Sequence, residues 1–257
     1  MARNPTLATL AVVDGCPINV ATLGEACDRL ADTAEAGEGF TFFTLNLDHL
    51  VKLRRDRAFH EAYDRATFVS ADGAPVVHLA RRQGARLERT TGADIVLPLS
   101  AEAARRRLPV YLFGSTRDSL AGAARELVAR YPGLEIAGLE SPPQGFDPAS
   151  PEADAVIERI AASGAKFCFI ALGAPKQEIF ADRTLQRSTG VGYLCIGAAL
   201  DFISGHQTRA PRFFQTAGIE WLWRLVTNPR RMASRYASCA LVYAEMLASP
   251  PRRAADG

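Results

Sequence analysis

One aspartate, Asp72, stands where a catalytic base could act. It follows the apolar run Phe68-Val69 and precedes Gly73, at the expected end of a short strand. A carboxylate that is partly desolvated at a strand end is suited to accept a proton from a substrate hydroxyl. Asp is also a common helix N-cap, and a helical pattern begins directly after Gly73. The residues alone leave both interpretations open, a general base or a cap.

Polar and glycine-rich segments follow several other apolar runs. The candidate site residues in these segments are Thr44, Asn46, Gly114, Ser115, Gly173, Pro175, Gln177, Glu178, Gly197 and Asp201. A glycine before a helix start exposes free backbone N–H groups to an anion, so residues 114–116 and 173–176 are candidates for a phosphate site. Tight turns explain the same glycines equally well. The helix dipole alone also explains Glu178, which falls in a first helical turn.

These segments are expected to be positioned by a mainly parallel sheet that is covered by helices. Short apolar, β-rich runs alternate with amphipathic helical patterns, which is typical of an α/β fold. Strands are predicted at residues 40–46, 67–71, 110–113, 134–138, 166–172 and 190–196. Helices are predicted at residues 47–65, 74–82, 116–131, 152–163 and 175–187, after an opening strand or hairpin and a helix at 22–36. Ligands of such sheets bind beyond the carboxyl ends of the strands, where the candidate residues lie.

Composition and charge limit the class of protein. The chain has 257 residues, 48% apolar and 23% charged, which suits a soluble globular domain with a small appendage. A net charge of +2 argues against a general nucleic-acid binder. Residues 205–257 carry a net charge of +5 and both tryptophans, on two amphipathic patterns separated by Asn228-Pro229. We therefore divide the chain into a core, residues 1–204, and a basic helical appendage, residues 205–257.

Several signals are absent from the sequence. There is no cationic region followed by an apolar stretch near Met1 and no run of about 18 apolar residues, so a cytoplasmic protein is expected. The five cysteines are scattered without a CxxC spacing, which favours reduced thiols that pack in the core. Dinucleotide-binding, P-loop and zinc-protease motifs are missing, as is the Asp-x-Asp that holds a metal on a nucleotide diphosphate. We expect neither a cofactor nor a metal.

A set of ordered motifs nevertheless resembles one family, the WecG/TagA/CpsF glycosyltransferases. The motifs are Thr44-Leu-Asn46, Ala71-Asp72-Gly73, residues 88–94, the Tyr-Leu-Phe-Gly run ending at Gly114, Pro142-Pro143, and residues 173–178, 197–205, 209–211, 220–224 and 229–231. The resemblance covers nearly the whole chain, with little of it before about residue 38 or after about Tyr243. It implies a Rossmann-like α/β core with helices on both faces of the sheet and a C-terminal appendage that completes the active site.

The activity that the resemblance implies is sugar transfer from a UDP-sugar to a polyprenyl-diphosphate-linked sugar, with inversion and without a metal. The transferred sugar would be of the N-acetylmannosamine type or a related hexose or uronic acid. Asp72 matches the general base, with Thr44 and Asn46 beside it, and Gln177 matches a donor-site residue. Arginines of the appendage match groups that face the diphosphate, and which of them does so stays open. The candidates are Arg209, Arg212, Arg224, Arg230 and Arg231, with Arg235 also within reach by sequence.

The resemblance also implies a location at the inner face of the bacterial cytoplasmic membrane. Arginines beside Trp221 and Trp223 suit peripheral contact with anionic lipid, where each nearby cation adds about 1 kcal/mol. A homo-oligomer is left open. Two alternative functions stay in view, a sugar-nucleotide-binding membrane adaptor without catalysis and a nucleotide-dependent oxidoreductase or methyltransferase. The missing glycine fingerprint argues against the second alternative.

Overall fold

One parallel sheet forms the centre of the protein. The computed structural model describes residues 8–211, 213–214 and 220–249. Six strands pair in the order β4-β3-β8-β7-β5-β6, and all five pairs are parallel. The strands are β3 (Phe40–Leu45), β4 (Phe68–Ala71), β5 (Val110–Gly114), β6 (Ile136–Glu140), β7 (Phe167–Ala171) and β8 (Gly192–Cys195). A separate antiparallel hairpin, β1 (Ala11–Val13) and β2 (Cys16–Ile18), precedes them. The predicted fold class is confirmed.

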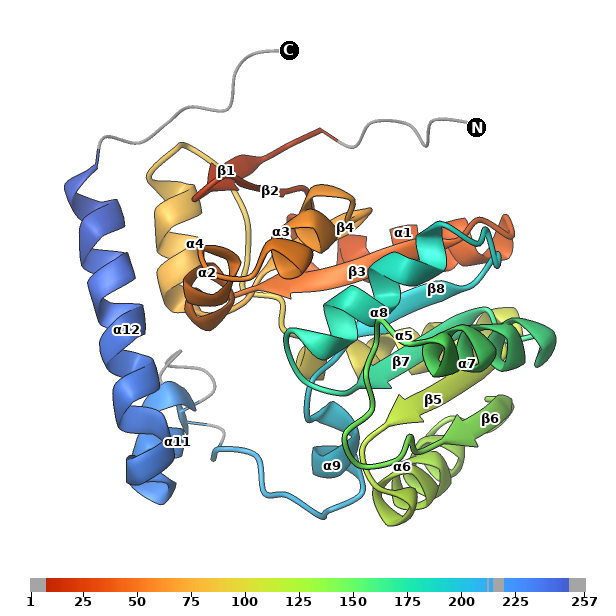
Figure 1. Cartoon of the computed structure of the whole chain (residues 1–257). Coiled ribbons are helices and arrows are strands. Elements are labelled where there is room, and N and C mark those ends of the chain that lie inside the picture. Colours follow the sequence, from red (N-terminus) through yellow and green to blue (C-terminus); the bar gives the residue numbers. More distant parts are fainter. Residues whose placement is uncertain (1–7, 212, 215–219, 250–257) are drawn as a thin grey trace.

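Helices pack on both faces of this sheet (Figure 1). One face is covered by α1 (Leu23–Glu35), α5 (Gly92–Arg106), α6 (Arg117–Arg130) and α9 (Ala199–Ile203). Buried side chains of the other face come from α2 (Leu47–Leu53), α3 (Arg57–Asp64), α4 (Ala74–Arg81), α7 (Pro151–Ala162) and α8 (Lys176–Leu185). The fold is therefore a Rossmann-like three-layer α/β arrangement.

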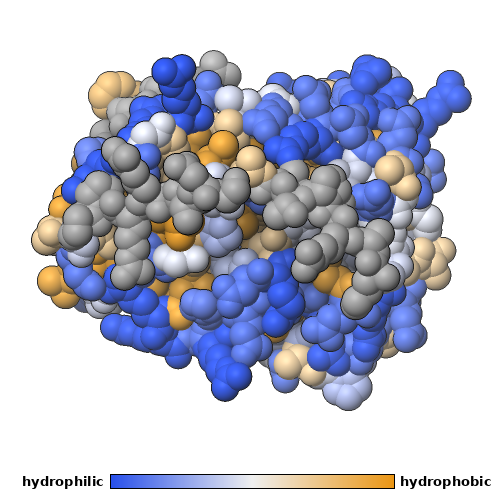
Figure 2. All heavy atoms as spheres, turned by 90° about the horizontal axis from the view of Figure 1, so that it is seen from above, coloured by the Kyte–Doolittle hydropathy of each residue, from blue (hydrophilic) through white to orange (hydrophobic). Residues whose placement is uncertain are grey.

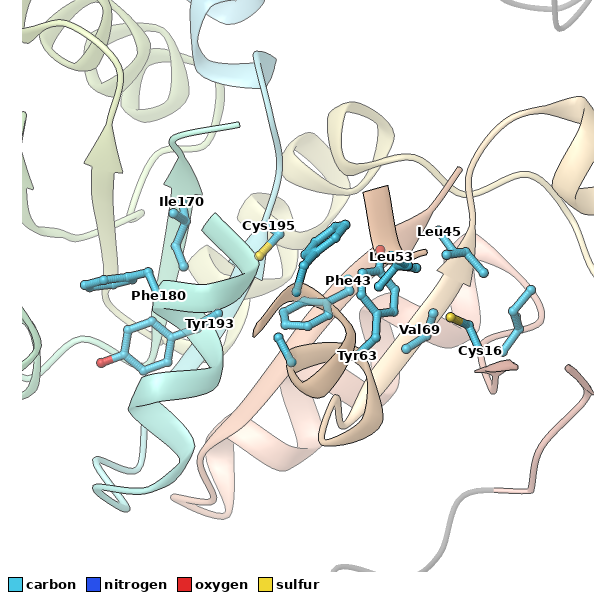
Figure 3. Close-up of a cluster of buried hydrophobic side chains, with 14 of the residues drawn as sticks. Cys16, Phe43, Leu45, Leu53, Tyr63, Val69, Ile170, Phe180, Tyr193 and Cys195 are labelled. Atoms are coloured by element: carbon cyan, nitrogen blue, oxygen red, sulfur yellow. The ribbon is translucent and has the colours of Figure 1, made fainter. Parts of the chain in front are cut away.

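Side chains along each strand point alternately to the two faces of the sheet, and they form one hydrophobic cluster on each face. In β3, Phe40 and Phe42 join the cluster under α1 and α5, while Phe43 and Leu45 join the cluster under α3 and α8. Side chains of neighbouring residues in a strand point to opposite faces, so a strand that is buried on both faces is mainly apolar. Figure 3 shows the second cluster, in which Phe43 lies beside Tyr63 with ring centroids 5.2 Å apart.

Two helices, α11 (Glu220–Thr227) and α12 (Pro229–Ala248), follow the core. Figure 1 shows α12 along one side of the molecule, next to α2 and α4, and residue contacts connect it with both helices and with α11. Its Val242 is buried in the same hydrophobic cluster as the hairpin and α2. An ion pair between Arg54 Nη1 and Glu245 Oε2, 2.8 Å long, adds a surface contact. The helical break predicted at Asn228-Pro229 is confirmed.

Two sequence predictions need correction. The helix predicted at residues 47–65 is two helices, because the Asp56 side chain accepts a hydrogen bond from Phe59 N and starts α3. The strand predicted at residues 134–138 is β6, which starts later because Leu134 N donates to Tyr131 O in a turn. Helix α5, which contains Pro98, fills the gap between α4 and β5.

Gly92 allows α5 to begin directly against the end of β8. A Cβ atom at this position would lie 2.7 Å from Ile196 Cα, so no other residue fits without a backbone shift. The Thr91 side chain caps the helix by accepting from Asp94 N at 3.1 Å. This close approach brings the residue 88–94 motif to the carboxyl edge of the sheet.

All five cysteines are buried and unpaired, as predicted. Within the part of the chain that the structure describes, no helix is long and apolar enough to span a membrane. Hydrophilic side chains dominate the face shown in Figure 2, and smaller hydrophobic groups are exposed between them.

Candidate active site

A cavity of about 380 Å³ lies between the core and the two C-terminal helices. The core side of the lining includes Asn46 after β3, Asp48 in α2, Asp72 after β4 and Arg89 before α5. Helices α11 and α12 contribute the other half of the lining, namely Glu220, Trp221, Arg235, Tyr236, Cys239, Ala240 and Tyr243. The cavity therefore has polar groups on its core side and three aromatic residues on its helical side.

Asp72 lines this cavity beside Asn46. Its backbone N–H donates to Leu45 O at 2.8 Å, so the ends of β3 and β4 are tied together. Asn46 Nδ2 donates to Asp72 Oδ2 at 3.3 Å, and Asn46 Oδ1 accepts from His49 N at 3.0 Å. The N-cap residue of α4 is Gly73, with a positive φ of 88°. Asp72 thus lies one residue before the cap position, and its carboxylate is positioned by Asn46.

Thr44 lies deeper than these two residues. It is buried within β3 and does not belong to the cavity lining. Its backbone carbonyl accepts from the Tyr63 hydroxyl at 3.4 Å, and that hydroxyl lies 2.7 Å from His49 Nδ1. Burial lowers the pKa of His49 to about 3, so its ring is neutral and serves packing and hydrogen bonding. This buried network fixes the turn from β3 into α2 that carries Asn46.

Asp48 connects α12 to the core at the cavity wall. Both of its oxygens accept from Arg235, at 2.6 and 2.7 Å, and Oδ2 also lies 2.8 Å from Lys52 Nζ. Burial disfavours the ionised carboxyl, but the two cations outweigh it and lower the pKa of Asp48. Lys52 Nζ further donates to Ala174 O at 2.9 Å, in the loop after β7. One chain of contacts thus links α12, α2 and that loop.

The predicted arginines have different surroundings. Arg209 donates to Asp94 Oδ1 at 2.6 Å and to Glu220 Oε1 at 3.3 Å, so two carboxylates hold its guanidinium at the cavity edge. Arg230 is exposed at the start of α12. Arg212 lies outside the described residues. Arg224 and Arg231 lie in α11 and α12, but their side chains are outside the described part of the structure.

A second polar cluster lies at the ends of β5 and β7 and the start of α9. Gly114 and Ser115 both have a positive φ, and Ser115 Oγ donates to Asp201. Gln207 Nε2 donates to the other oxygen of Asp201 at 2.8 Å. The N–H of Ser115 donates to Ala171 O at 2.8 Å. That amide is therefore used within the fold, which corrects the prediction that it is free for a phosphate.

The side chains of Gln177 and Glu178 are buried at the start of α8. Gln177 Oε1 accepts from the backbone N–H of Gly173 and of Gly197, both at 3.2 Å, so the Gly173 amide is not free for a phosphate either. Pro175 is the N-cap residue of α8 and has no N–H. Glu178 is fully buried, and burial raises the pKa of its carboxyl to about 7. Direct contact of Glu178 with a substrate therefore stays a prediction, and the structure places this side chain inside the fold.

Residues of α12 form the part of the site that sequence reasoning missed. Tyr236, Cys239, Ala240 and Tyr243 belong to the second of the two amphipathic patterns, and in the structure they form one stripe along α12. Helical periodicity predicts that such residues share one face of a helix, but it does not predict which part of the protein that face packs against. The stripe closes the cavity opposite Asp72, and Tyr236 packs edge-on against Trp221 with ring centroids 5.9 Å apart.

The cavity combines a carboxylate held by an amide, aromatic walls and nearby cations. A carboxylate in this setting can accept a proton from a hydroxyl group, and aromatic faces can pack against sugar rings or other apolar surfaces. Residues 11–254 match the sequence model described as the glycosyl transferase WecG/TagA/CpsF family. The match includes both helices that close the cavity as well as the core. The chain belongs to the WecG/TagA/CpsF family of glycosyltransferases.

Proposed function

We propose that the protein transfers a hexose-type sugar from a UDP-sugar to a hydroxyl of a polyprenyl-diphosphate-linked sugar, with inversion and without a metal ion. The observation that carries this proposal is the position of Asp72, at the edge of a cavity with its Oδ2 3.3 Å from Asn46 Nδ2. The donor sugar would be of the N-acetylmannosamine type or a related hexose or uronic acid, as the family resemblance implies.

Asp72 is the general base of this reaction. Its carboxylate accepts the proton of the acceptor hydroxyl as the hydroxyl oxygen forms a bond to the anomeric carbon. The bond from that carbon to the diphosphate breaks on the opposite face, and UDP leaves with the electron pair. One displacement at the anomeric carbon inverts its configuration. Asn46 holds the carboxylate in place, and its own orientation is fixed by the N–H of His49.

Arginines of residues 205–257 neutralise the charge that develops on the diphosphate. Arginine is always charged and matches phosphate oxygens with two parallel donors. Arg209 and Arg235 lie at or near the cavity, although carboxylates pair with both of them in the structure. Arg230 is exposed on the same appendage. The donor nucleotide binds at the glycine turns after β5, β7 and β8, on the same carboxyl edge of the sheet.

The appendage, residues 205–257, also contacts the inner face of the bacterial cytoplasmic membrane. Phe213 and Val226 are each 71% exposed, and Trp221 is 45% exposed. Large apolar side chains near exposed arginine suit a surface that lies at an anionic lipid interface. The protein is thus a peripheral enzyme that meets its lipid-linked acceptor at the membrane.

The proposal predicts acceptor-dependent release of UDP that is unaffected by EDTA. The sequence lacks an Asp-x-Asp motif, and in the described residues no three His, Cys, Asp or Glu side chains are grouped as metal ligands. The measurement uses a panel of UDP-sugars with a polyprenyl-diphosphate-linked sugar as the acceptor, with and without excess chelator. Loss of activity in EDTA that Mg²⁺ or Mn²⁺ restores would contradict the role of arginine. UDP-sugar binding without any turnover would favour a non-catalytic adaptor.

A further inference from the structure

Two glycine turns follow β7 and β8 at the carboxyl edge of the sheet. Gly173 has a φ of 73° and Gly197 a φ of 59°, both in the left-handed region that favours glycine. A Cβ atom added at either position would meet no atom within 4 Å apart from the adjacent residues, so both turns border open space. The conformation of these two turns therefore determines part of the surface that a ligand would contact at the carboxyl edge of the sheet.

A single side chain holds both turns. Gln177 Oε1 accepts from Gly173 N and from Gly197 N, each at 3.2 Å. A glutamine amide has an accepting oxygen and a donating nitrogen, so only one of its two orientations can serve two N–H donors. With the amide turned over, its NH₂ group would face both backbone N–H groups. Something must therefore fix the orientation of the Gln177 amide.

Glu178 is placed to do so. Its Oε1 accepts from Gln177 Nε2 at 2.8 Å, and a carboxyl oxygen can accept there in both its charged and its neutral form. The side chain is fully buried, and its Oε2 has no hydrogen-bond partner among the described residues. A buried, half-satisfied carboxyl costs stability, which an apolar residue of similar size would avoid.

Other charged or titratable groups surround Glu178 without pairing with it in the described structure. Lys52 and Asp48 of α2, Tyr63 of α3 and Cys195 of β8 interact with it electrostatically. Lys52 instead donates to Ala174 O at 2.9 Å and so holds the turn after β7 from the other side. In the described structure, the hydrogen bond with Gln177 is thus the contact that connects the Glu178 side chain to the two glycine turns.

We propose that Glu178 is a positioning residue that orients the Gln177 amide, so that Gln177 holds the Gly173 and Gly197 turns in the shape that binds the nucleotide-sugar donor. The donor part of this inference rests on the function proposed above. The structural part, which concerns the two turns, does not. Glu178 acts only through Gln177 and does not touch the substrate.

Amide hydrogen exchange in the full-length protein without substrate tests the structural part. Glu178→Leu removes the acceptor at similar volume, Gln177→Leu removes the residue that it orients, and Glu178→Gln keeps an accepting oxygen. We expect exchange at Gly173 and Gly197 to become about tenfold faster in both Leu variants and to stay near wild type in Glu178→Gln. Glu158→Gln, an exposed change on α7, is the matched control. Unchanged exchange in Glu178→Leu, or equal effects of Gln and Leu at residue 178, would overturn the proposal.

Steady-state kinetics test the donor part. Both Leu variants should raise the KM for the UDP-sugar about tenfold with kcat within about threefold, and the double variant should be no worse than Gln177→Leu alone. Glu178→Gln should restore the wild-type KM. Faster exchange with an unchanged KM would refute the link to donor binding. If the wild-type protein released no UDP with any donor, the proposed function would fail while the exchange results still decided the positioning role.

Discussion

Replacing Asp72 with Asn is expected to lower the turnover number by roughly 10²- to 10⁴-fold, the usual contribution of a general base. An amide cannot take the proton of the acceptor hydroxyl at neutral pH. The substitution keeps the size of the side chain and the backbone hydrogen bond from residue 72 to Leu45 O, 2.8 Å long. The fold and the affinity for UDP should therefore stay close to wild type.

The kcat and KM of both proteins are measured by UDP release, and the affinity for UDP by calorimetry. Asp28→Asn serves as the matched control, because Asp28 is exposed on α1 and does not line the cavity. This control should leave all three quantities unchanged. If Asp72→Asn kept a turnover within about twofold of wild type, Asp72 would have a structural role and the base would have to be sought elsewhere.

Deletion of residues 205–257 is expected to abolish nearly all transfer to the lipid-linked acceptor. Seven residues that line the cavity belong to α11 and α12, so their removal opens the site to water and takes away the nearby arginines. All six strands of the parallel sheet precede residue 205, so the core should still fold. It should be more prone to association, because the surface covered by Val242 becomes exposed. Circular dichroism measures whether the truncated core folds. Vesicle flotation measures whether membrane binding is lost, as expected.

Point variants in the full-length chain separate catalysis from membrane contact. Tyr236→Ala changes the cavity wall, whereas Leu241→Ala changes a residue of α12 that is 72% exposed and does not line the cavity. On a water-soluble acceptor analogue, Tyr236→Ala should lower kcat/KM by about tenfold or more and Leu241→Ala should have no effect. Full activity of the truncated core on that analogue would mean that the appendage is only a membrane anchor.

Local sequence signals predicted most elements of the fold. The strands that became β5 and β7 are continuous apolar runs and β3 is a mainly apolar one, and such runs indicate strands that are buried on both faces of a parallel sheet. The break inside residues 47–65 was missed because Asp56 had to be recognised as a cap within an otherwise helical pattern. This error arises where one capping residue overrides the helical periodicity around it.

The candidate site was predictable only at the strand ends. Asp72 and Asn46 were identified because parallel strands end at a common edge, where ligands bind. The pairing of Asp48 with Arg235 spans 187 residues of sequence and depends on how α12 docks on α2. The inward direction of Glu178 was also not predicted, since a first-turn glutamate is usually exposed and stabilised by the helix dipole. Long-range packing decides both features.

The anomeric configuration of the product tests the central claim most directly, namely that an acceptor hydroxyl deprotonated by Asp72 displaces UDP in one step. The wild-type protein is incubated with the preferred UDP-sugar and the lipid-linked acceptor in EDTA, and the new glycosidic bond is examined by NMR. A single displacement predicts a configuration opposite to that of the donor. Retention of the donor configuration would contradict the account, because it requires two displacements or a front-face reaction in which Asp72 is not the base.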